Sequence, residues 1–390
     1  MFVHTSTGGR QFSAASFQVT QKSLKNTPGI GITTQPDAES DVERLHFSKC
    51  GRSQFEAEAS PFTIAHISDP HLSRRYYREH IKSLKMLLRA ILEAGCDHIV
   101  ISGDIVSTAD PDDFYLAREV FSNYGLLDSR MLTVVPGNHD IFGGPHRAVD
   151  VISFPRHIRS VDYRKNLDLF YDAFPETFVG AKHLVKDQVY PFIKHVGPFA
   201  LLGLNSIPPW SFLHNPLGTN GIIEETQLEA LRTLNVQTEI GPSIPVAVIH
   251  HHFNDLTDDS VEDGLWKTIE SKTMRMKKRR RLLKVLSSLN VRYALHGHIH
   301  RNELYERNGI RLANGAGAVC DDPLQNLKYN SLSQAGGVCE LRTCHLPIPY
   351  QTSTVTQKIG RRTRQAVSYN PSEVLVSELN HVAAVRNVHP

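Results

Sequence analysis

The chain has 390 residues, of which 40% are hydrophobic and 21% are charged, and its formal net charge is +3. A chain of this length can bury at least one complete hydrophobic core, and its near balance of charge gives no global argument for a nucleic-acid or membrane partner. It contains neither an apolar run long enough to span a bilayer nor a secretory signal pattern. Its five cysteines include no Cys-x-x-Cys motif, which favours a reducing compartment. We therefore expect a cytoplasmic protein without a membrane span.

Residues 1–60 are rich in Ser, Thr, Gly and Gln and show no hydrophobic periodicity. No acidic residue precedes Asp37, as in organellar transit peptides, but this stretch has a single arginine, Arg10, and no clear amphipathic helix. We expect residues 1–60 to be a disordered extension. The folded domain is then predicted to span residues 61–345.

Short apolar strands alternate with amphipathic helices from residue 62 to residue 140. Apolar residues recur with helical spacing between Ile81 and Leu92, which predicts a helix packed on a sheet. The strands are predicted over residues 63–67, 98–101 and 132–135, and a second helix over about 113–124. This alternation indicates an α/β fold whose sheet is covered by helices.

The alternation stops between residues 141 and 187, where Gly143, Gly144 and three prolines accompany several aromatic residues. Long excursions within compact domains are often functional. We expect residues 141–187 to be an insertion or cap with a small aromatic cluster of its own.

Regular elements resume after residue 187. The pattern predicts a hairpin of strands 190–194 and 199–204, a helix over 224–234, strands over 246–249 and 291–295, and a closing hairpin of 302–306 and 310–313. A basic segment, 272–284, leads into another amphipathic helix, and we interpret its Lys277–Arg281 run as a solvated helix face because no aromatic residues are interleaved with it. Residues 346–390 form a tail with a possible helix over 372–388.

Polar residues suited to binding metal follow five of the apolar runs. They are Asp69 and His71, Asp104, Asn138 with His139, one of the histidines 250–252, and His298 with His300. Sites in open α/β sheets form beyond the carboxyl ends of the strands, so these residues are expected to converge. About seven oxygen and nitrogen ligands, without a thiolate, suit two metals that share a carboxylate better than one structural zinc.

These motifs, in this order, resemble the calcineurin-like metallophosphoesterase superfamily. The family pattern of Asp-x-His, Gly-Asp, Gly-Asn-His-Asp, His and Gly-His-x-His is complete over residues 62–315. The resemblance implies a four-layer α/β/β/α sandwich with a dinuclear metal site at the carboxyl ends of its strands. The two ions would be divalent or trivalent Mn, Fe, Zn, Co or Ni.

The resemblance also implies a division of the ligands. Asp69, His71 and His300 would hold one ion, Asn138, His251 and His298 would hold the other, and Asp104 would bridge them. The family usually follows its isolated histidine with x-Pro, and Phe253 takes the place of that proline here, which favours His251. His250, which is nearest to the strand, remains the alternative.

By the same resemblance, His139 would stabilise the developing charge or protonate the leaving group, and Asp140 would orient its imidazole. A hydroxide that bridges the two metals would attack phosphorus.

The subfamily is indicated by the Ser-Asp-Pro-His-Leu opening at residues 68–72, which is most similar to bacterial class III cyclic-nucleotide phosphodiesterases. Ser107 stands where purple acid phosphatases have a metal-binding tyrosine, and the Arg-Gly signature of Ser/Thr protein phosphatases is missing. We expect the substrate to be a small phosphodiester such as a 3′,5′-cyclic nucleotide. The alternatives are a phosphomonoesterase, a nucleotide or lipid pyrophosphatase, a metal-dependent nuclease that uses the basic helix, and a non-catalytic binding scaffold.

Overall fold

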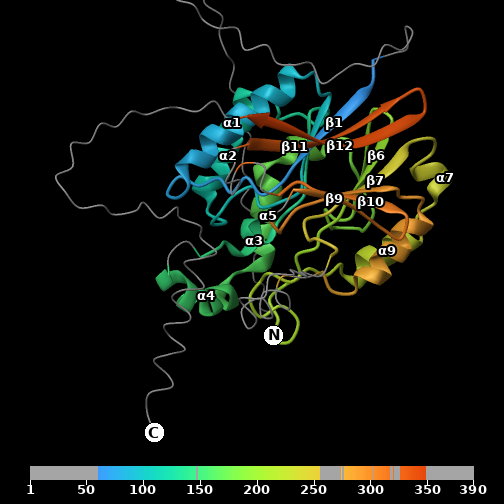
Figure 1. Cartoon of the computed structure of the whole chain (residues 1–390). Coiled ribbons are helices and arrows are strands. Elements are labelled where there is room, and N and C mark those ends of the chain that lie inside the picture. The colour runs from blue at the N-terminus through green and yellow to red at the C-terminus, as the bar shows by residue number, and fades with distance from the viewer. Residues whose placement is uncertain are drawn as a thin grey trace, which may run out of the picture. The chain divides into compact units, whose positions relative to one another are not determined.

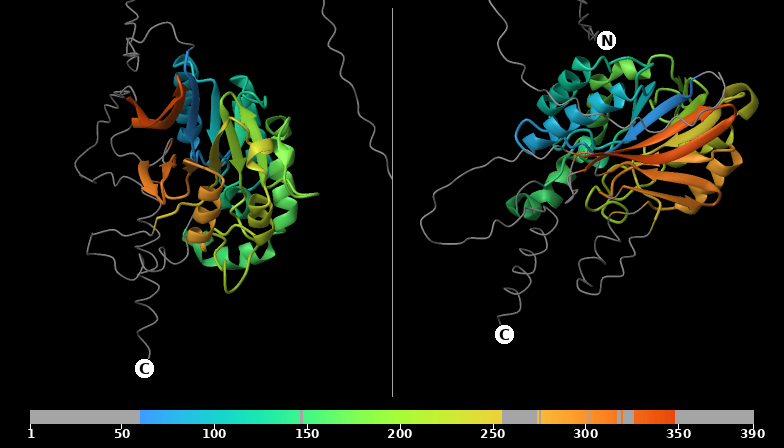
Figure 2. Two further views of the ribbon diagram at one scale, coloured as in Figure 1. Left: turned by 90° about the vertical axis from the view of Figure 1, so that its right-hand side faces the viewer. Right: turned by 45° about the horizontal axis from the view of Figure 1, so that its top comes forward.

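The computed structural model describes residues 60–145, 148–254, 274, 276–300, 302–316, 319 and 326–347. The predicted extension over residues 1–60, except for its last residue, and the predicted helix over 372–388 lie outside the described residues. Within them, two β-sheets pack face to face and helices cover the outer side of each sheet (Figures 1 and 2). This is the predicted four-layer α/β/β/α sandwich.

The first sheet has five strands in the order β12-β11-β1-β2-β3. Their bounds are β1 (Phe62–Ile67), β2 (His98–Ile101), β3 (Leu132–Val134), β11 (Asn326–Ala335) and β12 (Val338–Pro347). The three N-terminal strands are parallel, with Ile64 opposite His98, whereas β11 runs antiparallel to β1 with Phe62 opposite Gln334. The parallel strands bring the turns after β1, β2 and β3 to one edge of the sheet.

Two helices cover the outer face of this sheet, α1 (Arg78–Glu93) and α2 (Pro111–Asn123) (Figure 1). Leu84, Leu87, Leu88 and Ile91 form the buried stripe of α1, as their spacing predicts. The start of α2 is set by Asp110, whose side chain accepts a hydrogen bond from the backbone N–H of Asp112. Among the described residues, no helix combines the length and the apolar character that crossing a membrane requires.

The second sheet has seven strands in the order β4-β5-β6-β7-β8-β10-β9. Their bounds are β4 (Lys182–His183), β5 (Phe192–Val196), β6 (Phe199–Gly203), β7 (Ile244–Val248), β8 (Tyr293–His296), β9 (Glu303–Arg307) and β10 (Ile310–Asn314). The neighbouring strands β6, β7, β8 and β10 are parallel. Its carboxyl edge therefore carries the turns after β7 and β8.

Side chains of the second sheet alternate between two cores. Val246 and Val248 of β7 pack into the core that this sheet shares with the first one. Ala247 and Ile249 face the opposite way and pack with the apolar sides of α6 (Glu225–Arg232) and α9 (Arg279–Ser288). The short helix α7 (Val236–Glu239) precedes β7 on this outer side. Because strand residues alternate with a period of two, this phase also decides the direction of the residues that follow β7.

The segment predicted as an insertion contains α3 (Asn138–Phe142), α4 (Ala148–Ser160), α5 (Tyr163–Ala173) and the 3₁₀ helix η1 (Pro175–Phe178). Its aromatic residues contact one another, with the Phe170 and Phe174 ring centroids 5.4 Å apart, and they also join the main core. The ring of Phe174 lies 6.1 Å from that of Phe114 and 5.8 Å from that of Phe121, both on α2. The segment is thus anchored in the main core.

Candidate metal centre

The side chains that could bind metal come from both sheets. Asp69 and His71 follow β1, Asp104 follows β2, Asn138 begins α3 directly after β3, His250 follows β7, and His298 and His300 follow β8. The structure brings them into two adjacent groups of nitrogen and oxygen atoms. They lie at the carboxyl ends of the parallel strands, as predicted from the sequence.

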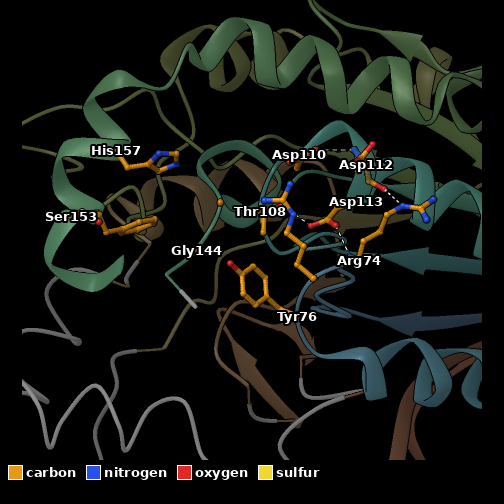
Figure 3. A pocket seen from close by; sticks show the side chains of 12 residues that line it. Arg74, Tyr76, Thr108, Asp110, Asp112, Asp113, Gly144, Ser153 and His157 are labelled. Carbon is orange, nitrogen blue, oxygen red and sulfur yellow. Dashed lines mark hydrogen bonds between the residues drawn. The ribbon is translucent and has the colours of Figure 1, made fainter. Parts of the chain in front are cut away.

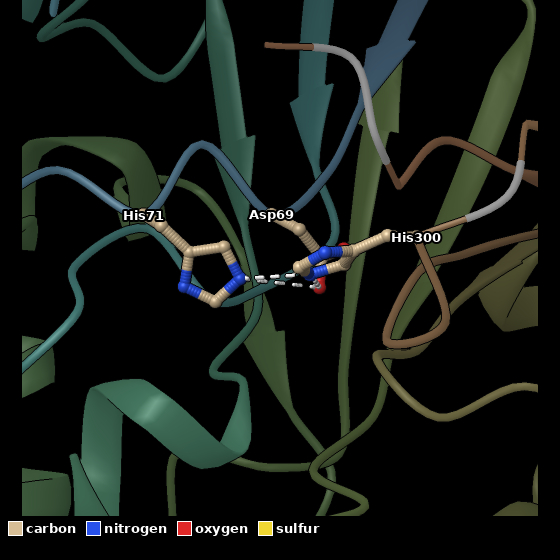
Figure 4. A group of neighbouring side chains, drawn as sticks. All are labelled: Asp69, His71 and His300. Atoms are coloured by element: carbon tan, nitrogen blue, oxygen red, sulfur yellow. Dashed lines mark hydrogen bonds and ion pairs between the residues drawn. The ribbon is translucent and has the colours of Figure 1, made fainter. Parts of the chain in front are cut away.

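Asp69, His71 and His300 form the first group (Figure 4). The Nε2 atoms of the two histidines are 3.0 Å apart. Asp69 Oδ1 lies 3.9 Å from His71 Nε2 and 3.8 Å from His300 Nε2. Three potential ligand atoms thus converge on one point.

The second group consists of Asp104, Asn138, His250 and His298. Asn138 Oδ1 lies 3.1 Å from His250 Nε2 and 2.9 Å from His298 Nδ1, and these two nitrogens are 3.2 Å apart. Asp104 Oδ2 completes the group at 3.4 Å from His250 Nε2.

Asp104 lies between the two groups. Its Oδ2 atom, which faces His250, is also 3.8 Å from His71 Nε2. Its Oδ1 atom accepts a hydrogen bond of 2.8 Å from the backbone N–H of His139. One carboxylate oxygen is therefore placed to contact cations in both groups.

The hydrogen bonding of the second group fits a cation. His250 Nδ1 lies 2.9 Å from the carbonyl oxygen of Ser102, which can only accept, so Nδ1 carries a hydrogen and Nε2, when it is not protonated, presents its lone pair. That lone pair faces the Asn138 amide oxygen, another acceptor. Two acceptors at this distance repel each other unless a positive charge, either a proton on Nε2 or a metal ion in its place, lies between them. The residues therefore fit the metal ions that their types and spacing predict.

The carboxylates and the charged imidazoles of the site stabilise each other against the cost of burying their charges. Burial opposes the charge on His250, but the Asp104 and Asp69 carboxylates outweigh it and raise the pKa of His250 to about 9. Burial likewise opposes the charge on Asp104, yet His250 and His139 hold the pKa of Asp104 well below its usual value. For His71 and His298, burial together with neighbouring histidines lowers the pKa, so both imidazoles are neutral and able to coordinate metal.

Four of these residues have left-handed backbone conformations. The φ angles of Asp69, His71, Asp104 and His298 are 57°, 45°, 51° and 79°. Such conformations are uncommon outside glycine and persist only where the surrounding structure imposes them. Here the backbone N–H groups of Asp69 and His71 bond to the carbonyls of Gly103 and Asp104. The turns after β1 and β2, which carry Asp69, His71 and Asp104, thus stabilise each other's backbone conformation.

Position 297 of the Gly-His-x-His motif requires glycine because its backbone lies too close to Ser68 and Asp69 for a side chain. A β-carbon at this position would lie 2.0 Å from Ser68 Oγ and 2.2 Å from Asp69 Oδ2. The backbone N–H of His298 donates to the Asp69 carboxylate at 3.1 Å. The missing side chain lets the β8 turn approach Asp69.

His250, not His251, occupies the ligand position after β7. The sequence favours His251, but its Nδ1 lies 2.8 Å from Ser206 Oγ and its Nε2 lies 3.2 Å from the carbonyl oxygen of Thr219. The alternation of β7 explains the difference, because His250 continues the face of Val248 between the two sheets and His251 continues the opposite face. The structure therefore places His250 in the group with Asp104 and His298, and His251 outside it.

His139 lies beside both groups. One of its ring nitrogens is within 4.8 Å of the ligand atoms of His71 and Asp104, and its ring centroid is 4.6 Å from that of His71. Its Nδ1 lies 3.3 Å from the carbonyl oxygen of Ser107.

Asp140 does not orient the His139 imidazole as the resemblance implies. Its Oδ1 accepts from the backbone N–H of Val106 and its Oδ2 from that of Gly137, at 2.9 and 2.8 Å. Burial, with the nearby Asp104 charge, raises the pKa of Asp140 to about 8. The residue joins the loop after β2 to the loop after β3 and thereby positions Asp104 and Asn138.

The family model described as calcineurin-like phosphoesterase matches residues 62–302, which is more than half of the chain. The chain belongs to the calcineurin-like phosphoesterase family. Members of this family are metal-dependent phosphoester hydrolases, and the family implies divalent ions in a dinuclear site. No curated protein sequence matches the chain at a significant level.

Solved structures similar to this calcineurin-like phosphoesterase include three enzymes. A dimetal phosphatase from Danio rerio is 17% identical, with 72% of this chain and 98% of that chain covered and a TM-score of 0.47. A purple acid phosphatase from yellow lupin (Lupinus luteus) is 12% identical, with 74% and 52% covered and a TM-score of 0.44. An archaeal phosphodiesterase is 11% identical, with 73% and 100% covered and a TM-score of 0.33.

Other residues around the phosphoesterase site support the ligands. The Ser107 hydroxyl donates to the carbonyl of His71 at 2.9 Å, and the Ser102 carbonyl fixes the His250 ring as described above. The sequence does not single out these two serines for such roles, since neither lies in a motif of its own. His296 is buried outside both groups, with Nε2 at 2.7 Å from the hydroxyl of Tyr305.

Proposed function

We propose that the chain is a two-metal phosphodiesterase, with a 3′,5′-cyclic nucleotide as its expected substrate. The observation that carries the two-metal assignment is the position of Asp104, whose Oδ2 atom faces His71 on one side and His250 on the other. In this proposal Asp69, His71 and His300 hold one cation and Asn138, His250 and His298 hold the second. Two bound cations would supply a nucleophilic water at neutral pH and offset negative charge on the phosphoryl oxygens.

Two further residues, His139 and Asp140, have roles in this proposal besides the metal ligands. The imidazole of His139 is partly exposed beside both groups and is proposed to stabilise the developing charge or to protonate the leaving oxygen. The hydrogen bond from its backbone N–H to Asp104 fixes its distance from the metal ligands. Asp140, through its two backbone hydrogen bonds, is proposed to keep that arrangement rigid.

Two substitutions test the assignment of chemistry. We expect Asp104→Ala to abolish hydrolysis and to lower metal content, whereas His139→Ala should retain both metals and lose about 10²- to 10⁴-fold in kcat. Metal content per chain and turnover of bis-p-nitrophenyl phosphate by Mn²⁺-loaded protein measure both effects. Asp168→Ala, an exposed carboxylate on α5, is the matched control. Retained activity in Asp104→Ala would overturn the two-metal mechanism.

The preference for a diester is supported by the resemblance of residues 68–72 to class III cyclic-nucleotide phosphodiesterases. We expect bis-p-nitrophenyl phosphate to have a higher kcat/KM than p-nitrophenyl phosphate, and 3′,5′-cyclic AMP to be hydrolysed. A preference for the monoester would remove the diester assignment and leave the phosphoesterase chemistry in place. Absence of any hydrolysis by metal-loaded protein would instead favour a binding scaffold.

A further inference from the structure

A pocket of about 280 Å³ is lined by residues that follow the ligand turns in the chain, while no candidate ligand is among its lining residues (Figure 3). Its walls come from the loop that follows His71, the loop that follows Asp104, the glycines at the end of α3, and helix α4. Figure 3 shows Arg74, Asp112 and Asp113 on one side of the pocket and the α4 residues Ser153 and His157 on the other. Three of the four wall segments therefore continue directly from turns that carry ligands or His139.

Gly144 connects this pocket to His139. The residue lines the pocket, and a β-carbon placed on it would lie 2.0 Å from Cε1 of the His139 ring. The imidazole proposed to serve the leaving oxygen thus lies directly behind the pocket wall. A leaving group that His139 serves would therefore lie near this pocket.

Several charged groups in the lining already have hydrogen-bond or ion-pair partners. Both carboxylate oxygens of Asp113 accept hydrogen bonds, one from the Arg74 backbone N–H at 2.8 Å and one from the Thr108 hydroxyl. Arg74 in turn donates from Nε to the carbonyl of Asp112 and lies 3.7 Å from Glu119. These pairs form the frame of the pocket and leave other groups for a ligand.

The groups left for a ligand are an aromatic face, a cation and carboxylate edges. The Phe154 and His157 rings are nearly parallel, with an interplanar angle of 24° and centroids 5.9 Å apart. Arg75 lines the pocket and its guanidinium forms no ion pair with any residue in the described part of the chain. Asp110 uses Oδ1 to cap α2, which leaves Oδ2 as an acceptor.

These lining groups favour one class of leaving group over the others. A lipid chain would have to lie against charged side chains, which makes its burial unfavourable. A second phosphate would face three aspartates in the lining. A heteroaromatic group with hydroxyls and ring nitrogens can instead stack on the aromatic face, accept from Arg75 and donate to Asp110. The volume is close to the lower limit of about 300 Å³ for small-molecule sites, which suits one such group.

We propose that this pocket binds the nucleoside part of the substrate, with the base stacked on the Phe154–His157 ring pair, and that Phe154 determines specificity for it. The inference rests on the proposed function, since it places the nucleoside beside His139 on the leaving-group side. The substrate class is thereby a nucleoside phosphodiester. Its sugar hydroxyls donate to Asp110.

Direct binding of adenosine to Mn²⁺-loaded full-length protein tests the assignment without requiring turnover. We expect adenosine to bind the wild type and Phe154→Tyr with similar affinity and Phe154→Ala at least about 10-fold more weakly, because stacking contributes about 1–3 kcal/mol per base. Ribose, which has no base, should bind none of them. Arg75→Ala is a second variant whose side chain is exposed and whose folding is not at risk, and it should also weaken binding.

Tyr115→Ala is the matched control, because this aromatic side chain on α2 is 66% exposed and lies outside the pocket. Equal adenosine affinity in wild type, Phe154→Ala and Arg75→Ala, or no binding at all, would overturn the pocket assignment even if phosphodiesters are hydrolysed. Binding that depends on Phe154 in a protein that hydrolyses no phosphoester would sustain the pocket and overturn the proposed function. The two failures are therefore distinguishable.

Discussion

His250 and His251 are adjacent in the chain and their ring centroids lie 5.2 Å apart, yet it is His250 that directs a ring nitrogen toward the other candidate ligands. His250 points between the sheets, where its Nε2 meets Asn138 and Asp104. His251 has both ring nitrogens within hydrogen-bonding distance of the protein, at Ser206 and at the carbonyl of Thr219. An imidazole with both nitrogens committed has no lone pair to offer a metal.

We accordingly predict different losses for the two alanine variants. His250→Ala should bind about one metal ion fewer per chain than the wild type and lose phosphoesterase activity. His251→Ala should keep its metals and be destabilised by about 1–3 kcal/mol, because it leaves buried hydrogen-bonding partners unsatisfied. Metal analysis after dialysis, together with urea unfolding, measures both results. Loss of metal from His251→Ala alone would restore the assignment made from the sequence.

At this scale the sequence predicts which residue types gather but not every side-chain direction. Asp69 and Asp104 can be assigned because each is the only carboxylate in its motif. Among the three consecutive histidines the motif is ambiguous. The spacing to Phe253 favours His251, whereas the structure places His250 with the other candidate ligands. The phase of Val246 and Val248 is the sequence signal that points to His250, since residues two apart share one side of a strand.

At the scale of elements, the hairpin of β11 and β12 is the part of the first sheet that the hydrophobic pattern does not reveal. β11 pairs with β1, the strand that leads to Asp69 and His71. Its buried positions include Asn330, which donates to the carbonyl of Asn314 and accepts from the Thr343 hydroxyl. Because polar residues in this strand are satisfied by specific partners, a simple apolar alternation is missing. The signal that remains is Gly336-Gly337, a turn pair between two extended segments.

That turn gives a prediction about stability. Gly336 and Gly337 have φ angles of 53° and 82°, and a β-carbon on Gly337 would meet nothing within 4 Å. Gly337→Val should therefore cost about 1–2 kcal/mol through backbone strain alone, whereas Gly336→Asn should cost a few tenths, because Asn tolerates this conformation. The free energy of unfolding in urea measures the difference. Equal stability of the two variants would show that the hairpin does not depend on a left-handed turn.

At the scale of the whole molecule, the two sheets are joined by a buried lysine as well as by their shared core. Lys194 lies on β5 of the second sheet, and its Nζ atom donates to the carbonyl of Leu132 on β3 of the first sheet. A second bond reaches the carbonyl of Thr177 in η1, and both are 2.6 Å long. Lysine is rarely buried, so the sequence predicts the four layers from their periodicity but not this link between them.

The link makes stability depend on pH in a defined direction. Burial lowers the pKa of Lys194 from 10.5 to about 7, although Asp128 opposes the shift. The unfolded chain therefore binds a proton up to about pH 10.5 that the folded chain releases above about pH 7. Because unfolding takes up a proton in this window, Lys194 makes stability rise with pH between those values, by at most about 1.4 kcal/mol per pH unit.

Lys194→Met isolates this contribution, because the variant has no proton to take up at this position. We predict that the unfolding free energy of the wild type minus that of Lys194→Met increases by about 1 kcal/mol per pH unit from pH 7.5 to pH 9.5, measured in urea at a fixed metal concentration. Titration of other groups cancels in the difference. Lys182→Met, which removes an exposed lysine paired with Glu239, is the matched control for the loss of a lysine. Parallel curves for wild type and Lys194→Met would mean that Lys194 keeps its proton when buried, with its charge satisfied by the two carbonyls.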